Sequence, residues 1–215
     1  MCRLLLVQSE IPFSIADYLR PFAHIAQHSK EYQGHGWGCA YLADQYWVRY
    51  RNLTPIWEDN LDQFGTTRLL LAHARSAFRD EGIVVENNMP FWDNTYMFIF
   101  NGELRGVRIR EEGRTGAEKI FRVIRRFERG DLKAGVHKAV TVIEKRTRYV
   151  RAMNFMIASR KRVVVNSYFN EDPAYFTLHR KPIPGGMIIA SEPFAGETDW
   201  EAIPNRTIEE YTWSF

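Results

Sequence analysis

Cys2 could supply both a nucleophile and its base. If Met1 is removed, as it is when the following side chain is small, Cys2 carries a thiol and a free α-amine. An α-amine has a reference pKa of about 7.7–8.0 and can accept a proton near neutral pH. A thiol activated in this way is a self-contained nucleophile for acyl transfer. The alternative is that Cys2 is only the second residue of a strand, and Cys2 alone favours that reading.

Asn101 and Gly102 could stabilise the oxyanion that acyl transfer creates. They follow the apolar run 96–100, and we expect the strand to end there. A side-chain amide and a backbone N–H at such a place can both point at one oxygen, and each donor lowers the barrier by about 2.7–4 kcal/mol. The alternative is an ordinary Asn-Gly hairpin turn, the more common use of this dipeptide.

Arg75 is a candidate for binding a carboxylate. It directly follows the continuous apolar run 69–74, and a buried guanidinium needs a partner. Its fork geometry suits the bidentate capture of a substrate carboxylate. A structural salt bridge with an Asp or Glu is the alternative.

Apolar patterning predicts the elements that must position these residues. Strands are expected at 3–8, 39–43, 46–51, 69–74, 96–100, 154–158, 163–168, 175–178 and 187–190. Helices are expected from a Ser14 cap to about 27, from a Thr115 cap to about 129, and over 132–146. Pro21 predicts that the first helix is kinked or starts later. Without a linker or repeat, residues 1–215 are expected to form one α+β domain.

Composition and charge exclude several classes. The chain is 45% hydrophobic and 14% aromatic, which excludes intrinsic disorder. Its net charge of +3 is too small to demand nucleic acid. Two cysteines form neither a disulfide framework nor a four-cysteine zinc site, and no metal or other cofactor is expected. No apolar run is long enough for a signal peptide or a membrane span, so we expect a cytoplasmic protein.

Six motifs occur in the order found in one enzyme family. They are Met-Cys-Arg-Leu-Leu at 1–5, Gly-His-Gly-Trp-Gly at 34–38, His-Ala-Arg-Ser-Ala at 73–77, Glu-Asn-Asn-Met-Pro-Phe at 86–91, Phe-Asn-Gly-Glu-Leu at 100–104 and Thr-Gly-Ala-Glu at 115–118. The match continues to Ile-Ala-Ser-Glu-Pro at 189–193 and Trp200. The chain thus resembles the class II glutamine amidotransferases, most of all their short, stand-alone branch.

The resemblance implies an N-terminal nucleophile hydrolase fold, a four-layer αββα sandwich of two antiparallel sheets. It implies that Cys2 attacks the glutamine side-chain amide, releasing ammonia and leaving a γ-glutamyl thioester. Asn101 and Gly102 would form the oxyanion hole, and Arg75 would hold the α-carboxylate beside Ser76 and Ala77. Implied partners are glutamine or a related amide and an ammonia-accepting synthase subunit. A homo-oligomer stays open, and neither nucleic acid nor a membrane is expected.

Departures from the family pattern leave the substrate open. Gly116 stands where the family has the Asp that binds the α-ammonium, a loss of about 1.5–3 kcal/mol. Gln33 and His35 replace a His and an Asp, and Met89 replaces a His. The carboxylate of Glu103 or Glu118 could take the place of the missing aspartate. Two alternatives therefore remain beside glutamine hydrolysis. One is an amidase for γ-glutamyl or other amide conjugates, and the other is a degenerate binding or scaffolding subunit.

Overall fold

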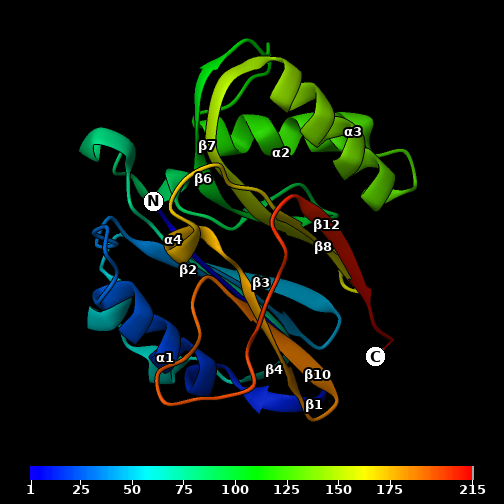
Figure 1. Ribbon diagram of the computed structural model, residues 1–215. Coiled ribbons are helices and arrows are strands. Elements are labelled where there is room, and N and C mark those ends of the chain that lie inside the picture. Colours follow the sequence, from blue (N-terminus) through cyan, green and yellow to red (C-terminus); the bar gives the residue numbers. More distant parts are fainter. Residues whose placement is uncertain (215) are drawn as a thin grey trace.

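Two antiparallel β-sheets stack face to face between helices in the computed structural model, which describes residues 1–214 (Figure 1). The larger sheet has the strand order β11-β9-β10-β1-β4-β2-β3. Its strands are β1 (Arg3–Ser14), β2 (Trp37–Ala43), β3 (Tyr46–Asn52), β4 (Thr66–Ala74), β9 (His179–Ile183), β10 (Gly186–Ala190) and β11 (Glu201–Ala202). The smaller sheet has the order β12-β8-β7-β6-β5. Its strands are β5 (Phe91–Trp92), β6 (Met97–Val107), β7 (Thr147–Ala158), β8 (Arg162–Ser167) and β12 (Thr207–Thr212).

Helices cover the two outer faces. α1 (Ile15–Gln27) packs on the larger sheet, whereas α2 (Gly116–Phe127) and α3 (Leu132–Lys145) pack on the smaller one (Figure 1). The short α4 (Pro173–Phe176) lies beside the N-terminus, and 3₁₀ turns occur at Ile56–Glu58, Leu61–Gln63, Phe78–Asp80 and Val85–Asn87. This arrangement confirms the expected αββα sandwich. Within residues 1–214, no helix is long and apolar enough to cross a membrane.

Alternation along the central strands sorts side chains between two cores. Leu4 and Leu6 of β1 belong to the core between the sheets, whereas Leu5 and Val7 pack under α1. The same alternation in β4 puts Leu71 between the sheets, so His73, two residues on, has the same orientation. Cys2 precedes Leu4 by two residues, so the same alternation directs its side chain toward the space between the two sheets.

Most of the expected elements are present. The hairpin of β2 and β3, the strands on both sides of β4, and the Thr115 cap of α2 are confirmed. α1 begins at Ile15 and includes Pro21, so the expected later start is wrong. Burial of its apolar face offsets the one hydrogen bond that Pro21 removes. Ser14 is the N-cap residue but its side chain makes no capping hydrogen bond.

β1 continues to Ser14 and β7 begins at Thr147, so both strands are longer than expected. Two further differences matter for the site. Residues 175–178 do not form a strand, because Pro173 starts the helical turn α4 and the chain extends again only at β9. The strand predicted at 96–100 does not end at Asn101. β6 continues to Val107, paired throughout with β7. Asn101 and Gly102 therefore lie within a long strand, not at a turn.

Candidate active site

Cys2 lies at the entry to β1, one of the central strands of the larger sheet. Because Arg3 pairs with Ala74, Cys2 lies beside the segment that leaves β4 at Arg75. The Cys2 thiol donates to the Ser76 carbonyl over 3.7 Å. Pairing with β4 thus brings Cys2 next to Arg75 and Ser76, three of the residues singled out in the sequence.

The Cys2 thiol has no side-chain base in this structure. Burial raises the pKa of the Cys2 thiol, although the N-terminal ammonium, the Ser76 contact and the Arg75 charge each act to lower it. Among the described residues, no His or carboxylate hydrogen-bonds to Cys2 Sγ. The α-amine of Cys2 is acylated by Met1 in this structure, so it has no free lone pair here.

Arg75 is a buried cation without a carboxylate partner in residues 1–214. Its side chain is 7% exposed and donates to Asn88 Oδ1 at 3.3 Å and to the Gly82 carbonyl at 2.9 Å. Neither acceptor carries a charge, so the structural salt bridge considered for Arg75 is wrong. Burial lowers the pKa of Arg75, a direction that an anionic ligand would reverse.

The segment after Arg75 is held in place by one histidine. The Ala77 N–H donates to His35 Nδ1 at 2.9 Å, and His35 Nε2 lies 3.3 Å from Asp80 Oδ1. Ala77 is buried, and the Ser76 carbonyl faces Cys2 as described above. Ser76 therefore contacts the thiol through its backbone carbonyl, and Ala77 follows it in a position held by His35.

Asn101 is fully buried and unsatisfied. It lies on the same face of β6 as Ile99, toward the space between the sheets, and neither its Oδ1 nor its Nδ2 has a hydrogen-bond partner. Its cross-strand neighbour Asn154 is equally buried, but Asn154 Nδ2 donates to the Phe176 carbonyl at 2.6 Å and Oδ1 accepts from Tyr168 N–H at 2.8 Å. Because buried polar groups are rarely left unpaired, Asn101 has the properties of a group that awaits a ligand.

Gly102 is required by a close approach between strands. A Cβ at Gly102 would lie 2.2 Å from the Ala152 carbonyl oxygen and 2.7 Å from Phe100 Cζ. The alternative of an Asn-Gly hairpin turn is therefore wrong, since the dipeptide pairs with β7 inside β6. The small residue brings the two backbones together immediately beside Asn101.

His73 is a second buried polar side chain on the inner face. It is fully buried, and neither ring nitrogen has a hydrogen-bond partner. Burial, with the nearby Arg75 charge acting in the same direction, lowers the pKa of His73 to about 3. The Phe100 backbone acts in the opposite direction but does not outweigh burial, so His73 is a neutral core histidine at neutral pH.

Glu103 and Gly116 are not brought together with these residues. Glu103 forms ion pairs with Arg105 at 2.6 Å and Arg151 at 3.5 Å. Gly116 begins α2 on the outer face of the smaller sheet, and a Cβ there would meet no atom within 4 Å. Glu118, the other acid considered, pairs with Arg114 at 3.3 Å. None of the three has a contact with Cys2 or Asn101 among the described interactions.

Residues around Met1 were not predicted from the sequence. The Met1 ammonium forms an ion pair with Glu31, which also pairs with Arg151 at 3.2 Å. The Met1 carbonyl accepts hydrogen bonds from Gln33 Nε2 at 2.5 Å and Tyr175 Oη at 2.6 Å. The residues around Met1 thus come from positions 30, 150 and 174 residues later in the chain. No local spacing in the sequence could have predicted these contacts.

The protein is similar in sequence to one hydrolase. No protein family model matches the chain. A γ-glutamyl-hercynylcysteine sulfoxide hydrolase from Mycolicibacterium smegmatis is 26% identical over 179 residues, which are 80% of this chain and 74% of that protein.

Solved structures decide the fold. The glutamine phosphoribosylpyrophosphate amidotransferase of Bacillus subtilis superimposes with a TM-score of 0.69 at 14% identity over 99% of this chain. The chain has the class II glutamine amidotransferase fold. It spans about half, 49%, of the B. subtilis enzyme. A glutamine aminotransferase class II domain protein from Silicibacter pomeroyi, with this fold and a TM-score of 0.68 at 17% identity, is covered over its whole length (100%), as is 99% of this chain.

Proposed function

We propose that this protein is an amidohydrolase that cleaves the side-chain amide of a γ-glutamyl compound, with Cys2 as its nucleophile. Glutamine is the smallest such compound. The observation that carries the proposal is the environment of Cys2. Its thiol lies beside a buried Arg75 that has no carboxylate partner, in a fold whose inner face also holds the unpartnered amide of Asn101.

The first half of the proposed reaction forms a thioester. After removal of Met1, the Cys2 thiol gives its proton to the free α-amine, and Sγ bonds to the amide carbon. Asn101 Nδ2 and the Gly102 N–H donate to the resulting oxyanion, where each donor counts for about 2.7–4 kcal/mol. The C–N bond then breaks, and the Cys2 ammonium returns the proton to the departing amine.

The second half of the proposed reaction uses water. A water molecule, deprotonated by the α-amine of Cys2, attacks the thioester carbon. The same oxyanion donors serve again, the C–S bond breaks, and Sγ recovers the proton. The products are glutamate and a free amine, or ammonia when glutamine is the substrate. Throughout, Arg75 holds the α-carboxylate with its planar guanidinium.

A γ-glutamyl conjugate is the substrate that one comparison favours over free glutamine, because the M. smegmatis relative is named for hydrolysis of a γ-glutamyl conjugate. Gly116, where the family carries the aspartate for the α-ammonium, does not separate the two substrates, since both carry that ammonium. Hydrolysis of glutamine itself, with ammonia passed to a synthase subunit, is the second candidate.

The test is an assay of glutamate release with protein whose N-terminus is Cys2. Glutamine and a set of γ-glutamyl amides are compared for the mature wild type, for protein that retains Met1, and for Cys2→Ala. We expect hydrolysis by the mature wild type only. The matched control is Cys39→Ala, because Cys39 is fully buried under α1 and away from the inner face.

Two results would contradict the proposal. If Cys2→Ala hydrolyses a γ-glutamyl amide as fast as the wild type, Cys2 is not the nucleophile. If the mature wild type cleaves none of the amides, the chain is a degenerate binding or scaffolding subunit.

A further inference from the structure

The position of Met1 marks one side of the reacting amide. In the proposed reaction, the α-amine of Cys2 returns a proton to the departing nitrogen, so this amine must face the leaving group. Met1 is bonded to that same amine in the structure. The residues that surround Met1 therefore lie on the side where the leaving group departs, opposite to the glutamyl carboxylate that Arg75 would hold.

Met1 is bound there by specific contacts. Its ammonium pairs with Glu31, and its carbonyl is held between Gln33 Nε2 and Tyr175 Oη, at 2.5 and 2.6 Å. The Met1 side chain also packs against the small core that contains Phe176. When Met1 is removed, Glu31 loses its ammonium partner but keeps Arg151. Gln33 Nε2 and Tyr175 Oη lose the Met1 carbonyl, although Gln33 Nε2 still donates to the Glu31 carbonyl at 2.7 Å.

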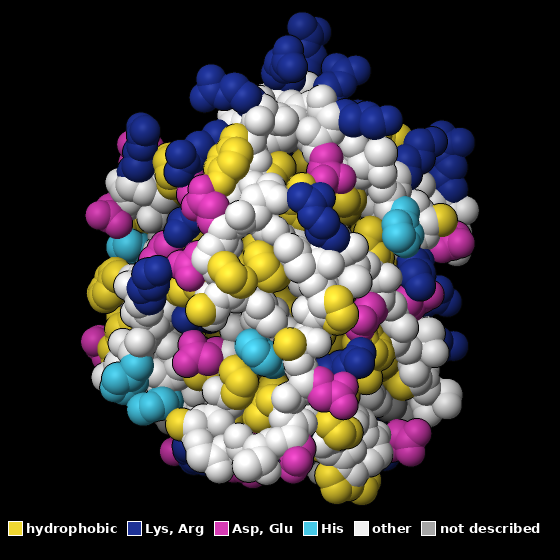
Figure 2. Space-filling model, in the orientation of Figure 1, with side chains coloured by type: hydrophobic (Ala, Val, Ile, Leu, Met, Phe, Trp, Pro, Cys, Tyr) yellow, Lys and Arg dark blue, Asp and Glu magenta, His cyan; other side chains and the backbone are white. Residues whose placement is uncertain are grey.

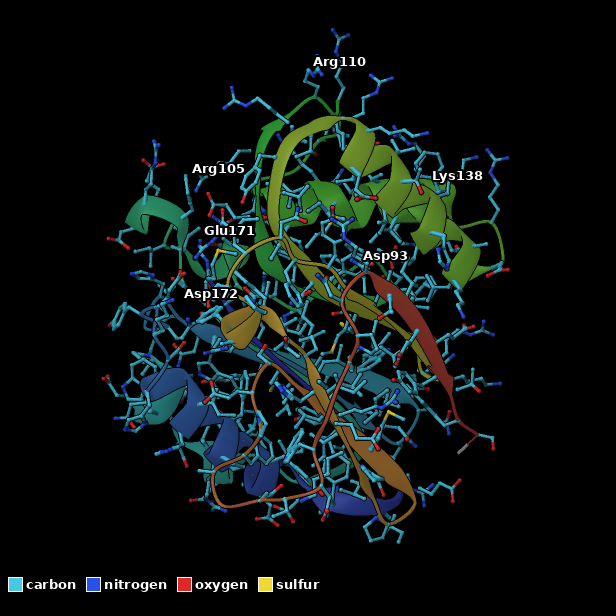
Figure 3. The ribbon with its side chains drawn as sticks, viewed as in Figure 1. Asp93, Arg105, Arg110, Lys138, Glu171 and Asp172 are labelled. Carbon is cyan, nitrogen blue, oxygen red and sulfur yellow. The ribbon has the colours of Figure 1, made fainter. Side chains whose placement is uncertain are left out.

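On the Glu31 side of Met1, carboxylates outnumber the guanidinium that they share. On the other side Arg3 lies over the Tyr175 ring at 4.0 Å, where it pairs with Glu192 at 3.0 Å. Glu31 lies 3.2 Å from Arg151, which also pairs with Glu103 at 3.5 Å and with Glu171 at 3.2 Å. Three carboxylates thus share one guanidinium, and Arg105 on the exposed side neutralises only Glu103. Figure 3 places Glu171 near Arg105 and Asp172 at the side of the molecule where the N-terminus lies. Figure 2 shows acidic and basic side chains interspersed on this side, whereas Lys and Arg predominate over the α2 and α3 layer at the top.

A buried acceptor supports the same preference independently of the carboxylates. Gln33 is 1% exposed, and although its Nε2 donates to Met1, its Oε1 has no hydrogen-bond partner. An oxygen buried in this way costs free energy unless a donor reaches it. A ligand that carries N–H groups would satisfy Gln33 Oε1 and the vacated Glu31 carboxylate together.

Local backbone structure presents Arg151 to this site. Glu103 faces Ala152 and Leu104 faces Val150 across β6 and β7, so Arg151 is the extra residue of a bulge. Bulges are frequent beside active sites, where they redirect a side chain. Burial alone would raise the pKa of Glu31, but the N-terminal ammonium and Arg151 outweigh it and lower that pKa. Glu31 is therefore ionised at neutral pH.

We propose that Glu31, Gln33 and Tyr175 form a leaving-group subsite. This subsite selects γ-glutamyl amides whose amine portion carries a positive charge, in addition to the α-ammonium of the glutamyl portion. This inference rests on the proposed function and adds the chemical class of the leaving group. Met1 occupies the subsite as a stand-in: its ammonium represents the second charge, and its carbonyl represents a polar group between that charge and the scissile bond.

The test compares two substrates of equal length. One is the γ-glutamyl amide of 1,4-diaminobutane, which carries a terminal ammonium, and the other is γ-glutamyl n-pentylamide, in which a methyl group replaces that ammonium. For the mature wild type we expect kcat/KM to be about tenfold higher for the cationic amide, the size of one charge-assisted hydrogen bond. In Glu31→Gln the ratio falls to near one. Glu10→Gln, with an exposed carboxylate near the far end of β1, keeps the wild-type ratio.

Each outcome decides the inference. A wild-type ratio near one, or an unchanged ratio in Glu31→Gln, overturns the leaving-group subsite while leaving the amidohydrolase proposal intact. If the mature wild type cleaves neither of these amides nor glutamine, the proposed function fails, and calorimetric binding of 1,4-diaminobutane against n-pentylamine then decides the subsite alone. Binding of the diamine that weakens about tenfold in Glu31→Gln supports it, and equal binding of both amines overturns it.

Discussion

Two clusters of polar side chains in this protein differ in how completely they are satisfied. Around Asp59, Oδ2 accepts from Trp37 Nε1, Tyr50 Oη and Asn52 Nδ2 at 2.8, 2.8 and 2.9 Å, and Oδ1 accepts from the Asn60 N–H at 2.8 Å. Between the sheets, by contrast, Asn101 and His73 are fully buried with no hydrogen-bond partner.

The difference distinguishes polar groups that stabilise the fold from polar groups that are available to bind a ligand. A satisfied network contributes stability and specificity, whereas unsatisfied buried groups cost free energy that folding must offset. Burial alone would raise the pKa of Asp59, but hydrogen bonds from Asn52, Trp37 and Tyr50 outweigh it and lower that pKa. Asn101 receives no such compensation from the protein, which is expected if its partner is the oxyanion of a reaction.

The largest effect is expected at Asn101. In Asn101→Ala, kcat for γ-glutamyl amide hydrolysis should fall about 10²–10³-fold, because one oxyanion donor is lost. The free energy of unfolding should stay the same or rise, since an unsatisfied buried amide is removed. The opposite profile is expected of the matched variant Asn154→Ala, which breaks two satisfied hydrogen bonds and should unfold more easily. Denaturant unfolding and steady-state kinetics measure both. A destabilised Asn101→Ala with full activity would reverse the assignment.

At Asp59 the expected effect is on stability alone. Asp59→Ala leaves the Trp37 and Tyr50 donors without their acceptor, and the free energy of unfolding should fall by about 2–3 kcal/mol. Activity of the folded protein should not change, because Asp59 lies on the α1 side of the larger sheet with Trp37. Equal stability of this variant and the wild type would show that the hydrogen bonds of the Asp59 cluster do not stabilise the fold, and that the two clusters do not differ in this respect.

A smaller effect is expected at Arg75. Arg75→Lys keeps the positive charge but loses the planar fork, so KM should rise about tenfold with a smaller change in kcat. Adding a substrate analogue that lacks the α-carboxylate sharpens the experiment. If wild type and Arg75→Lys differ as much on that analogue, Arg75 does not bind the carboxylate.

The effect that is smallest at neutral pH is a pH dependence of stability from His73. Its pKa is about 3 in the folded protein against 6.5 for an ordinary His, so between these values the unfolded chain binds a proton that the folded one does not. The free energy of unfolding therefore falls as pH drops from 6.5 towards 3, by up to about 1.4 kcal/mol per pH unit. His73→Gln should reduce this slope in urea unfolding at pH 7, 6 and 5. An unchanged slope would mean that His73 is protonated when buried.

Local patterns predicted the scaffold well. Apolar runs gave β1, β4 and β10, and helical spacing with a Thr115 cap gave α2, because each depends on neighbours within one element. The end of β6 was not predictable, since Asn-Gly is a turn signal in isolation. Here Gly102 is needed because a Cβ at this position would clash with the Ala152 carbonyl oxygen of β7. The strand expected at 175–178 failed because Pro173 starts a helical turn instead.

The candidate site was predictable only in part. The structure brings Cys2, Arg75 and Ser76 together, because β1 and β4 are neighbours and Arg3 pairs with Ala74. Glu31 and Arg151 were missed, since they meet Met1 through long-range packing and a bulge that leave no signal in spacing.

Covalent labelling tests the central claim most directly. The two cysteines give an internal comparison, because Cys39 is fully buried whereas Cys2 is half-buried. Mature protein is incubated with a glutamine analogue that carries an electrophilic carbon at the amide position, and its peptides are analysed by mass spectrometry. The account predicts one adduct, on the peptide that begins with Cys2, with parallel loss of hydrolysis and no labelling when Met1 is retained. An adduct on Cys39, or full hydrolysis by protein whose Cys2 is modified, would contradict it.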